Sequence, residues 1–219
     1  MDWGELEHDF RVSTQDTVAP YLFDSEDVLR WLKEAEDEAA IRGRLLHVAD
    51  DQTVCIIKID AGVSVYPLHP SLFELDHIGW VAQGSSQRER LALKSTEALD
   101  GIMPDWRERV DLPRYLVQSE TSVRVVPTPI CNGELKLEGY RLPLRPDRSK
   151  PEIHQAHHSY LVYWALKRAY SVPDSETMDL GRAVDAERLF TRYFGERPDS
   201  DLRRLTREDT DHHNRAFFL

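Results

Sequence analysis

The spacing of apolar residues changes twice along this chain, and these changes limit the folds that it can adopt. Near residues 24–42 and again over 151–195, apolar residues recur every three to four positions, which is the period of an amphipathic helix. Between these blocks the chain has short runs of β-branched and aromatic residues with strand-like alternation. This order predicts an α+β fold, a helical bundle with an inserted antiparallel β-rich region.

The same patterns divide the chain of 219 residues into four segments. We predict that residues 1–50 form the N-terminal helical part of the bundle and that 51–148 form the β-rich insertion. Residues 149–196 are expected to be a C-terminal helical hairpin that completes the bundle. The remainder, 197–219, is expected to be an extended C-terminal arm.

The first long helix carries clear start and stop signals. Asp24 or Ser25 is a favourable N-cap, and Gly43 is a natural C-terminal stop. Its apolar residues share one face, whereas acidic residues such as Glu36 and Glu38 lie on other faces and are expected to be solvated.

Three further helices are expected. One covers 4–13, one begins at Pro151, which suits a first helical position, and one ends at Gly195. The last two would form a helical hairpin that packs on the 24–42 helix.

Short strands are expected in the middle of the chain, with a helical turn over 96–102. Asn132-Gly133 is a strong β-hairpin signal. Closely spaced strands of this kind favour a small antiparallel sheet or sandwich. The expected strands cover residues 53–59, 63–66, 75–82, 90–93, 115–117, 122–126 and 135–140.

Bulk composition excludes several classes of protein. The formal net charge of −11 argues against nonspecific nucleic-acid binding, which needs a basic surface. No apolar run is long enough to span a membrane, and the acidic start lacks the apolar core of a signal peptide. Cys55 and Cys131 each lie in a strand-like run and are expected to be buried free thiols.

No pattern in the sequence indicates an enzyme. His154, His157 and His158 have the spacing of one helical face, but a metal site needs further ligands, so surface or partly buried histidines are the expected reading. Nucleophile-elbow, P-loop and dinucleotide-binding motifs are missing. We therefore expect no catalytic residue, no metal site and no cofactor.

The tail has an unusual composition. Arginines alternate with acidic residues until the chain closes on Phe217, Phe218 and Leu219. Two readings remain open, a disordered end or an arm that becomes ordered on a partner with the three apolar residues as its anchor.

Four stretches of sequence resemble head-to-tail adaptor (connector) proteins of tailed bacteriophages. The order and spacing of these stretches carry the resemblance, which is least specific over 84–140. They are DTVAPYLFDSE at 16–26 with the helix that follows, AGVSVYPLHP at 61–70, YLVYWALKRAY at 160–170, and residues 186–195.

The resemblance implies a structural protein of the virion. Adaptors of this family form a ring, typically of twelve copies, that binds beneath the portal protein, extends the DNA channel and provides the attachment site for a tail or nozzle protein. Genomic DNA would pass without specific binding, no membrane would be involved, and assembly would take place in the host cytoplasm. Because the arm of such proteins commonly climbs along the portal, we assign portal binding to Arg203, Arg204, Arg207, His212, His213, Asn214, Arg215, Phe217, Phe218 and Leu219.

Charge distribution suggests how copies would meet in a ring. A closed ring needs two different, complementary surfaces on each subunit. The first fifty residues are strongly acidic, whereas 88–94 and 141–150 are richer in base. We expect the changes Glu36→Lys and Glu38→Lys to weaken assembly. The expected subunit-interface residues are Glu34, Glu36, Asp37, Glu38, Arg145 and Arg148.

Two alternatives remain open. The first is another ring-forming virion component, such as a head-completion or tail-tube protein, which direct portal binding would distinguish. The second is a cell-wall hydrolase that uses a carboxylate or the histidine cluster, since some relatives in short-tailed phages have been linked to that activity. Metal content and a peptidoglycan assay would test it.

Overall fold

The computed structural model describes residues 1–144, 149–173 and 177–198. The longer helices and the sheets are segregated into different parts of the chain, so the expected α+β class is confirmed. The expected arm lies almost entirely outside the described residues.

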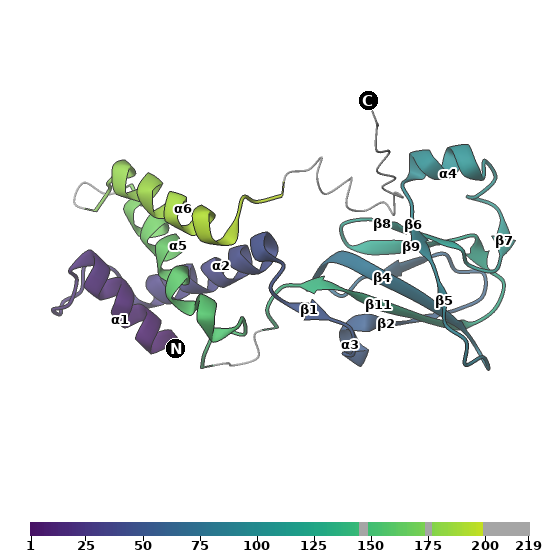
Figure 1. The fold of residues 1–219 in the computed structure, drawn as a ribbon, viewed down its shortest axis with the longest axis horizontal. Coiled ribbons are helices and arrows are strands. Elements are labelled where there is room, and N and C mark those ends of the chain that lie inside the picture. Colours follow the sequence, from purple (N-terminus) through teal and green to yellow (C-terminus); the bar gives the residue numbers. More distant parts are fainter. Residues whose placement is uncertain (145–148, 174–176, 199–219) are drawn as a thin grey trace, which may run out of the picture. The chain divides into compact units, whose positions relative to one another are not determined.

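The described residues form two compact units (Figure 1). Those of 1–47 and 140–198 form the helical unit, and 48–139 form the β-rich unit. Each unit is described by itself below.

The helical unit packs around a continuous apolar core. Leu6, Phe10, Val28, Leu32 and Phe190 lie at its centre and are fully buried. Helix α5 packs against α1, α2 and α6, as expected for a helical hairpin that joins the first long helix. The helices are α1 (Trp3–Thr14), α2 (Ser25–Gly43), the short 3₁₀ helix η1 (Gln155–His157), α5 (His158–Tyr170) and α6 (Leu180–Phe194).

Aspartates cap three of these helices. The Asp2 carboxylate accepts the Glu5 N–H at 2.8 Å, and the Glu5 carboxylate accepts the Asp2 N–H in return. Asp24 caps α2 by accepting the Glu26 N–H, and Asp179 caps α6 by accepting the Arg182 N–H. Helix α6 ends where Gly195 adopts a positive φ of 90°, as the sequence predicts.

The helix expected to begin at Pro151 begins later. Residues 151–154 are not helical, and α5 starts at His158. The carboxylate of Glu36 on α2 accepts the backbone N–H groups of Glu152 and Ile153. A side chain far away in the sequence therefore satisfies these donors in place of a helix N-cap.

The β-rich unit contains two larger sheets and a strand pair (Figure 1). One sheet has the order β1-β11-β4-β5 with β2 also paired to β11, the other has the order β3-β9-β8-β6, and β10 pairs with β7. The pairs β2–β11, β3–β9, β4–β5 and β8–β9 are antiparallel, whereas β6–β8 and β7–β10 are parallel. The strands are β1 (His47–Val48), β2 (Ile56–Ile59), β3 (Val65–Pro67), β4 (Leu72–Ala82), β5 (Glu89–Arg90), β6 (Ala92–Leu93), β7 (Val110–Asp111), β8 (Tyr115–Gln118), β9 (Ser122–Val126), β10 (Thr128–Pro129) and β11 (Gly133–Arg141).

Two short helices accompany these sheets. Helix α4 (Thr96–Ile102) is the helical turn that the sequence predicts, and its Leu99 packs with Trp106 and Val126. Helix α3 (Gln52–Cys55) occupies the start of the expected 53–59 strand. The prediction was wrong there because Asp51 caps a helical turn by accepting the N–H groups of Thr53 and Val54.

The Asn132-Gly133 pair is not a hairpin turn, which corrects a second prediction. It leads into β11, which pairs with β2 and β4. A Cβ atom on Gly133 would lie 2.4 Å from the Trp80 ring and 2.5 Å from the Val81 carbonyl oxygen. Glycine is needed there because another strand approaches closely, not because of the turn.

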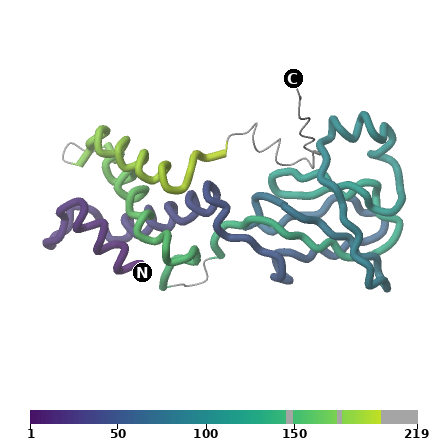
Figure 2. The backbone as a smooth tube through the Cα atoms, in the orientation of Figure 1, coloured from purple at the N-terminus to yellow at the C-terminus, as the bar shows by residue number. Residues whose placement is uncertain are grey.

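The chain leaves the helical unit after α2 and returns along β11 (Figure 2). At the helical end of these two connections, the Arg141 N–H donates to the Leu46 carbonyl oxygen at 3.0 Å. The His47 and Tyr140 rings also lie 5.2 Å apart, edge to face. Exit and return are therefore neighbours.

The two cysteines differ in environment. Both are free thiols, but only Cys55 is buried, whereas Cys131 is partly exposed, so the expectation of two buried thiols holds for one of them. Burial raises the pKa of the Cys55 thiol above its ordinary value. A raised pKa keeps Cys55 protonated and unreactive at neutral pH.

Candidate interaction surface

Residues 15–24 connect α1 to α2 and are held by one buried cation, Arg11. Its guanidinium donates to the Asp16 carboxylate at 2.9 Å and to the Glu7 carboxylate at 2.7 Å. It also donates to the Phe23 carbonyl oxygen and the Ser25 hydroxyl. One side chain on α1 therefore ties together both ends of the connector and the start of α2.

Asp16 continues this network into the connector backbone. Its two carboxylate oxygens accept the N–H groups of Leu22 and Phe23 at 2.9 and 3.1 Å. Phe23 is buried and packs edge to face on Phe10 and Trp31. The connector is thus fixed from inside the helical unit.

The outer side of this fixed connector is apolar. Val18 is 77% exposed, and Tyr21 and Leu22 are about half exposed. The Arg11 guanidinium stacks 3.7 Å from the Tyr21 ring centroid, which positions that ring as well. A connector that presents apolar side chains while buried charges hold its backbone has the features of a protein contact surface.

A second set of buried ionic contacts lies at the end of α6. Arg42 on α2 donates to Glu38 and to the Thr191 hydroxyl, each at 2.8 Å, and to the Gly195 carbonyl oxygen at 3.3 Å. Glu38 also pairs with Arg197 at 3.4 Å. The last described residues are therefore fastened to α2 before the tail continues.

Helix α2 positions the acidic residues that were expected at a subunit interface. Glu34 is partly exposed and pairs with Arg168 of α5 at 3.0 Å. Glu36 is only 1% exposed and binds the 152–153 backbone, and Glu38 is buried beside Arg42, so the expectation that both are solvated was wrong. A charge reversal at Glu36 or Glu38 would disrupt the fold before any subunit contact. Asp37 is partly exposed, and Arg145 and Arg148 lie outside the described residues.

The expected portal-binding residues all fall in the part of the chain that the structure does not describe. They are Arg203, Arg204, Arg207, His212, His213, Asn214, Arg215, Phe217, Phe218 and Leu219. Their assignment stays a prediction.

The three histidines at the start of α5 make separate contacts. Both ring nitrogens of buried His158 lie about 3 Å from carbonyl oxygens, those of Met1 and Ile153. His157 contacts the Tyr193 hydroxyl at 3.1 Å, and burial lowers its pKa, with His154 and His158 adding to the shift. Among the described residues, no group of three potential ligands could hold a metal ion.

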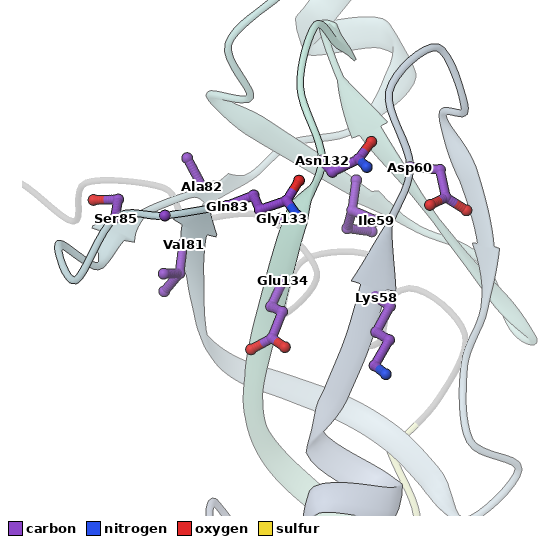
Figure 3. Close-up of a pocket in the computed structure, with 11 residues that line it drawn as sticks. Lys58, Ile59, Asp60, Val81, Ala82, Gln83, Ser85, Asn132, Gly133 and Glu134 are labelled. Atoms are coloured by element: carbon purple, nitrogen blue, oxygen red, sulfur yellow. The ribbon is translucent and has the colours of Figure 1, made fainter.

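The β-rich unit has a polar hollow of about 370 Å³ (Figure 3). Asn132 lies at its rim, where its side-chain oxygen accepts the Ala61 N–H and its carbonyl oxygen accepts the Gln83 N–H, both at 2.8 Å. These bonds hold two neighbouring turns together, so they explain the polar rim structurally. The lining residues are Lys58, Ile59, Asp60, Val81, Ala82, Gln83, Gly84, Ser85, Asn132, Gly133 and Glu134.

Comparison with known protein families identifies the class to which this chain belongs. The family described as SU10 adaptor protein matches residues 1–214, nearly the whole chain. The chain belongs to the SU10 adaptor family. No curated protein matches it.

Membership of the SU10 adaptor family identifies the chain as a phage head-to-tail adaptor, a structural protein of the virion. The resemblance found in the sequence is thereby confirmed. Across the described part of this adaptor, no helix is both long and apolar enough to cross a membrane. The candidate sites of an adaptor are contact surfaces. The connector carries part of the family resemblance, but sequence reasoning did not assign it a contact surface, because its conformation depends on the buried Arg11–Asp16 ion pair.

Proposed function

We propose that this adaptor is a structural protein without a catalytic role and assembles as a ring of twelve copies beneath the portal. There the ring extends the DNA channel and provides the attachment site for a tail or nozzle protein. The observation that carries the proposal is the family match, which runs through residues 199–214 of the tail. Residues 199–214 of the tail therefore fall within the family match, and Arg215, Phe217, Phe218 and Leu219 lie beyond it. In this proposal genomic DNA passes through the ring without specific binding, in keeping with the net charge of −11.

The C-terminal arm is the proposed portal-binding element. Its root is anchored, because Arg197 pairs with Glu38 and Arg42 bonds to the end of α6. An anchored root limits the volume that the arm must search, which lowers the entropic cost of docking. Phe217, Phe218 and Leu219 would supply the apolar anchor at its far end.

The experiment mixes the purified chain with the portal protein encoded by the same phage and images the mixture by electron microscopy. We expect a collar of density beneath the portal. Truncation after Pro198 should remove it, and the triple change Phe217→Ser, Phe218→Ser, Leu219→Ser should weaken binding at least tenfold. A triple change of Asp199, Asp201 and Asp209 to Asn is the matched control within the arm and should leave the collar in place.

Two results would contradict the proposal. One is a collar that persists unchanged without residues 199–219, which would remove the arm from portal binding. The other is no binding by the folded full-length chain, which would favour another position in the virion. Limited proteolysis adds a separate readout, because residues 197–219 should be cleaved in the free chain and protected on the portal.

A further inference from the structure

His158, the first residue of α5, makes two hydrogen bonds that a neutral histidine cannot make together. The residue is only 2% exposed, and its Nδ1 and Nε2 atoms lie 3.0 and 2.9 Å from the carbonyl oxygens of Met1 and Ile153. Both carbonyl oxygens are acceptors, whereas a neutral imidazole has one N–H donor and one nitrogen lone pair. Both contacts are therefore hydrogen bonds only when each ring nitrogen carries a proton, which gives the ring a positive charge.

A neutral ring in this position would leave two acceptors facing each other. The lone pair of one ring nitrogen would then point at a carbonyl oxygen within hydrogen-bonding distance. The ring itself is buried, so water does not take the place of the missing donor. The charged form of His158 is the one that matches the geometry.

A buried positive charge needs a negative partner, and Glu36 on α2 supplies one. Its carboxylate, also buried, accepts the N–H groups of Glu152 and Ile153. Ile153 therefore donates its N–H to a carboxylate and accepts at its carbonyl oxygen from the imidazolium. The two opposite charges polarise the same backbone segment, which strengthens both sets of hydrogen bonds.

Neighbours on the same turn oppose the charge on His158. Burial lowers the pKa of His157, and the nearby His154 and His158 add to that shift, so the three rings repel one another when protonated. The amino end of α5 also disfavours a cation, because the helix dipole is positive there. The charge is therefore held against opposing effects and is open to a change of pH.

The other ionic groups around this site are paired among themselves. At the start of the chain, the Met1 amino group lies 3.8 Å from the Glu5 carboxylate. In the segment after β11, the Glu152 carboxylate pairs with Arg141. Glu36 thus remains the carboxylate whose bonded backbone segment leads directly to the His158 ring.

The contacts of His158 join two segments that are far apart in the sequence. The first residues of the chain are held at the Met1 carbonyl oxygen, and 149–153 is held at the Ile153 carbonyl oxygen. The two segments also touch directly, because the Trp3 N–H donates to the Ser149 carbonyl oxygen at 3.1 Å. A single ring therefore connects the start of α1 to the segment that leads into α5.

We propose that His158 is a buried imidazolium that acts as a pH-dependent latch between the first residues of the chain and the segment 149–153. When it loses a proton, one ring nitrogen can no longer donate, and one of the two segments is released. The stabilisation is present while the ring is doubly protonated and is lost as the pH rises. This inference concerns the free chain and does not depend on the proposed ring.

Hydrogen exchange read by mass spectrometry tests the latch on the full-length chain. Protection is compared at about pH 5.5 and about pH 8.5, on either side of the ordinary histidine range, after correction for the intrinsic exchange rate. The fragments that matter contain Trp3 and Ile153, whose N–H groups bond within the joined segments. We expect protection of at least one fragment to fall roughly tenfold as the pH rises, the usual effect of losing one hydrogen bond.

Two variants assign the effect to one ring. His158→Gln cannot become charged, so its fragments should be weakly protected at both pH values. His154→Gln is the matched control, because His154 is exposed and only accepts the Ala156 N–H, which a glutamine oxygen can also accept. This control should keep the fall in protection that the wild type shows.

NMR of the wild-type chain labelled with ¹⁵N-histidine gives an independent measurement, which also decides the matter if His158→Gln does not fold. Both ring nitrogens of His158 should be protonated at about pH 5.5, and one should lose its proton over the same range in which protection falls. A neutral His158 ring at about pH 5.5 would overturn the proposal. So would a ring that titrates without any change in protection, or an equal fall in the His158→Gln variant.

Discussion

At the scale of single residues, a buried arginine governs the shape of the connector. Arg11 contacts two carboxylates, a carbonyl oxygen and a hydroxyl, and its side chain is nearly inaccessible to solvent. Charges buried in this way are tolerated only when they are paired and hydrogen-bonded. Removing Arg11 would leave the carboxylates of Glu7 and Asp16 without the opposite charge that balances them.

We predict that Arg11→Met lowers the free energy of unfolding by about 3–5 kcal/mol, the usual cost of breaking a buried ion pair. Urea denaturation followed by circular dichroism measures it. The control is Arg30→Met, because Arg30 pairs with Asp27 at 2.6 Å on the exposed surface. That pair should contribute no more than about 1 kcal/mol. Equal effects of the two changes would contradict the importance given to the Arg11 network.

Two glycines show how position decides the effect of the same substitution. A Cβ atom on Gly133 would collide with the Trp80 ring and the Val81 backbone, whereas one on Gly101 in α4 would meet no atom within 4 Å. Gly133→Ala should therefore destabilise the chain by about 1–3 kcal/mol through overpacking.

Gly101→Ala serves as the opposite case. It should stabilise the chain by about 0.5–1 kcal/mol, since alanine is the better helix former. Thermal unfolding of both variants checks these predictions, because Gly133→Ala should lower the midpoint and Gly101→Ala should raise it. A neutral Gly133→Ala would show that the approach of the two strands can relax.

At the scale of elements, local signals predicted some helices well and failed elsewhere for physical reasons. Helix α2 follows from its Asp24 cap and apolar face, and α6 from its period and Gly195. The segment after Pro151 has suitable local chemistry for a helix, but a carboxylate more than 100 residues away takes its N–H groups. Propensity alone cannot show such a long-range contact.

The β-rich segment has similar limits. Most strands follow from the alternation of apolar residues. Asn132-Gly133 has the composition of a hairpin turn, but glycine is needed at 133 because the Trp80 ring leaves no room for a Cβ atom. The candidate surfaces were less predictable than the fold. Glu36 is buried against a backbone segment distant in sequence, and Glu38 pairs with both Arg42 and the distant Arg197. The Arg11 network fixes the connector that carries Val18.

At the scale of the whole molecule, the chain behaves as a helical unit with a large excursion. Because Leu46 and Arg141 are hydrogen-bonded, the helical unit closes on itself at the points where the excursion begins and ends. Each unit has apolar residues buried within it, which is the property that lets a domain fold alone.

We therefore predict that residues 48–139 can be replaced by a linker of about four Gly and Ser residues, a length that suffices to join neighbouring antiparallel strands. The shortened chain should keep its helical circular dichroism spectrum and unfold in one cooperative transition. The isolated 48–139 fragment is the reciprocal test and should give a dispersed NMR spectrum. Loss of helical structure in the shortened chain would show that the helical unit needs the β-rich unit in order to fold.

The adjacent exit and return also have a mechanical consequence. A force applied to the β-rich unit reaches the helical unit through two covalent connections, one from the end of α2 and one through Arg141, whose guanidinium is paired with Glu152. Tension is divided between these two paths, and neither runs through α6 or Arg197. An adaptor pulled from its β-rich side would therefore load the end of α2 and the segment after Arg141 together, and it would load the root of the arm only through the non-covalent contacts of that root with α2.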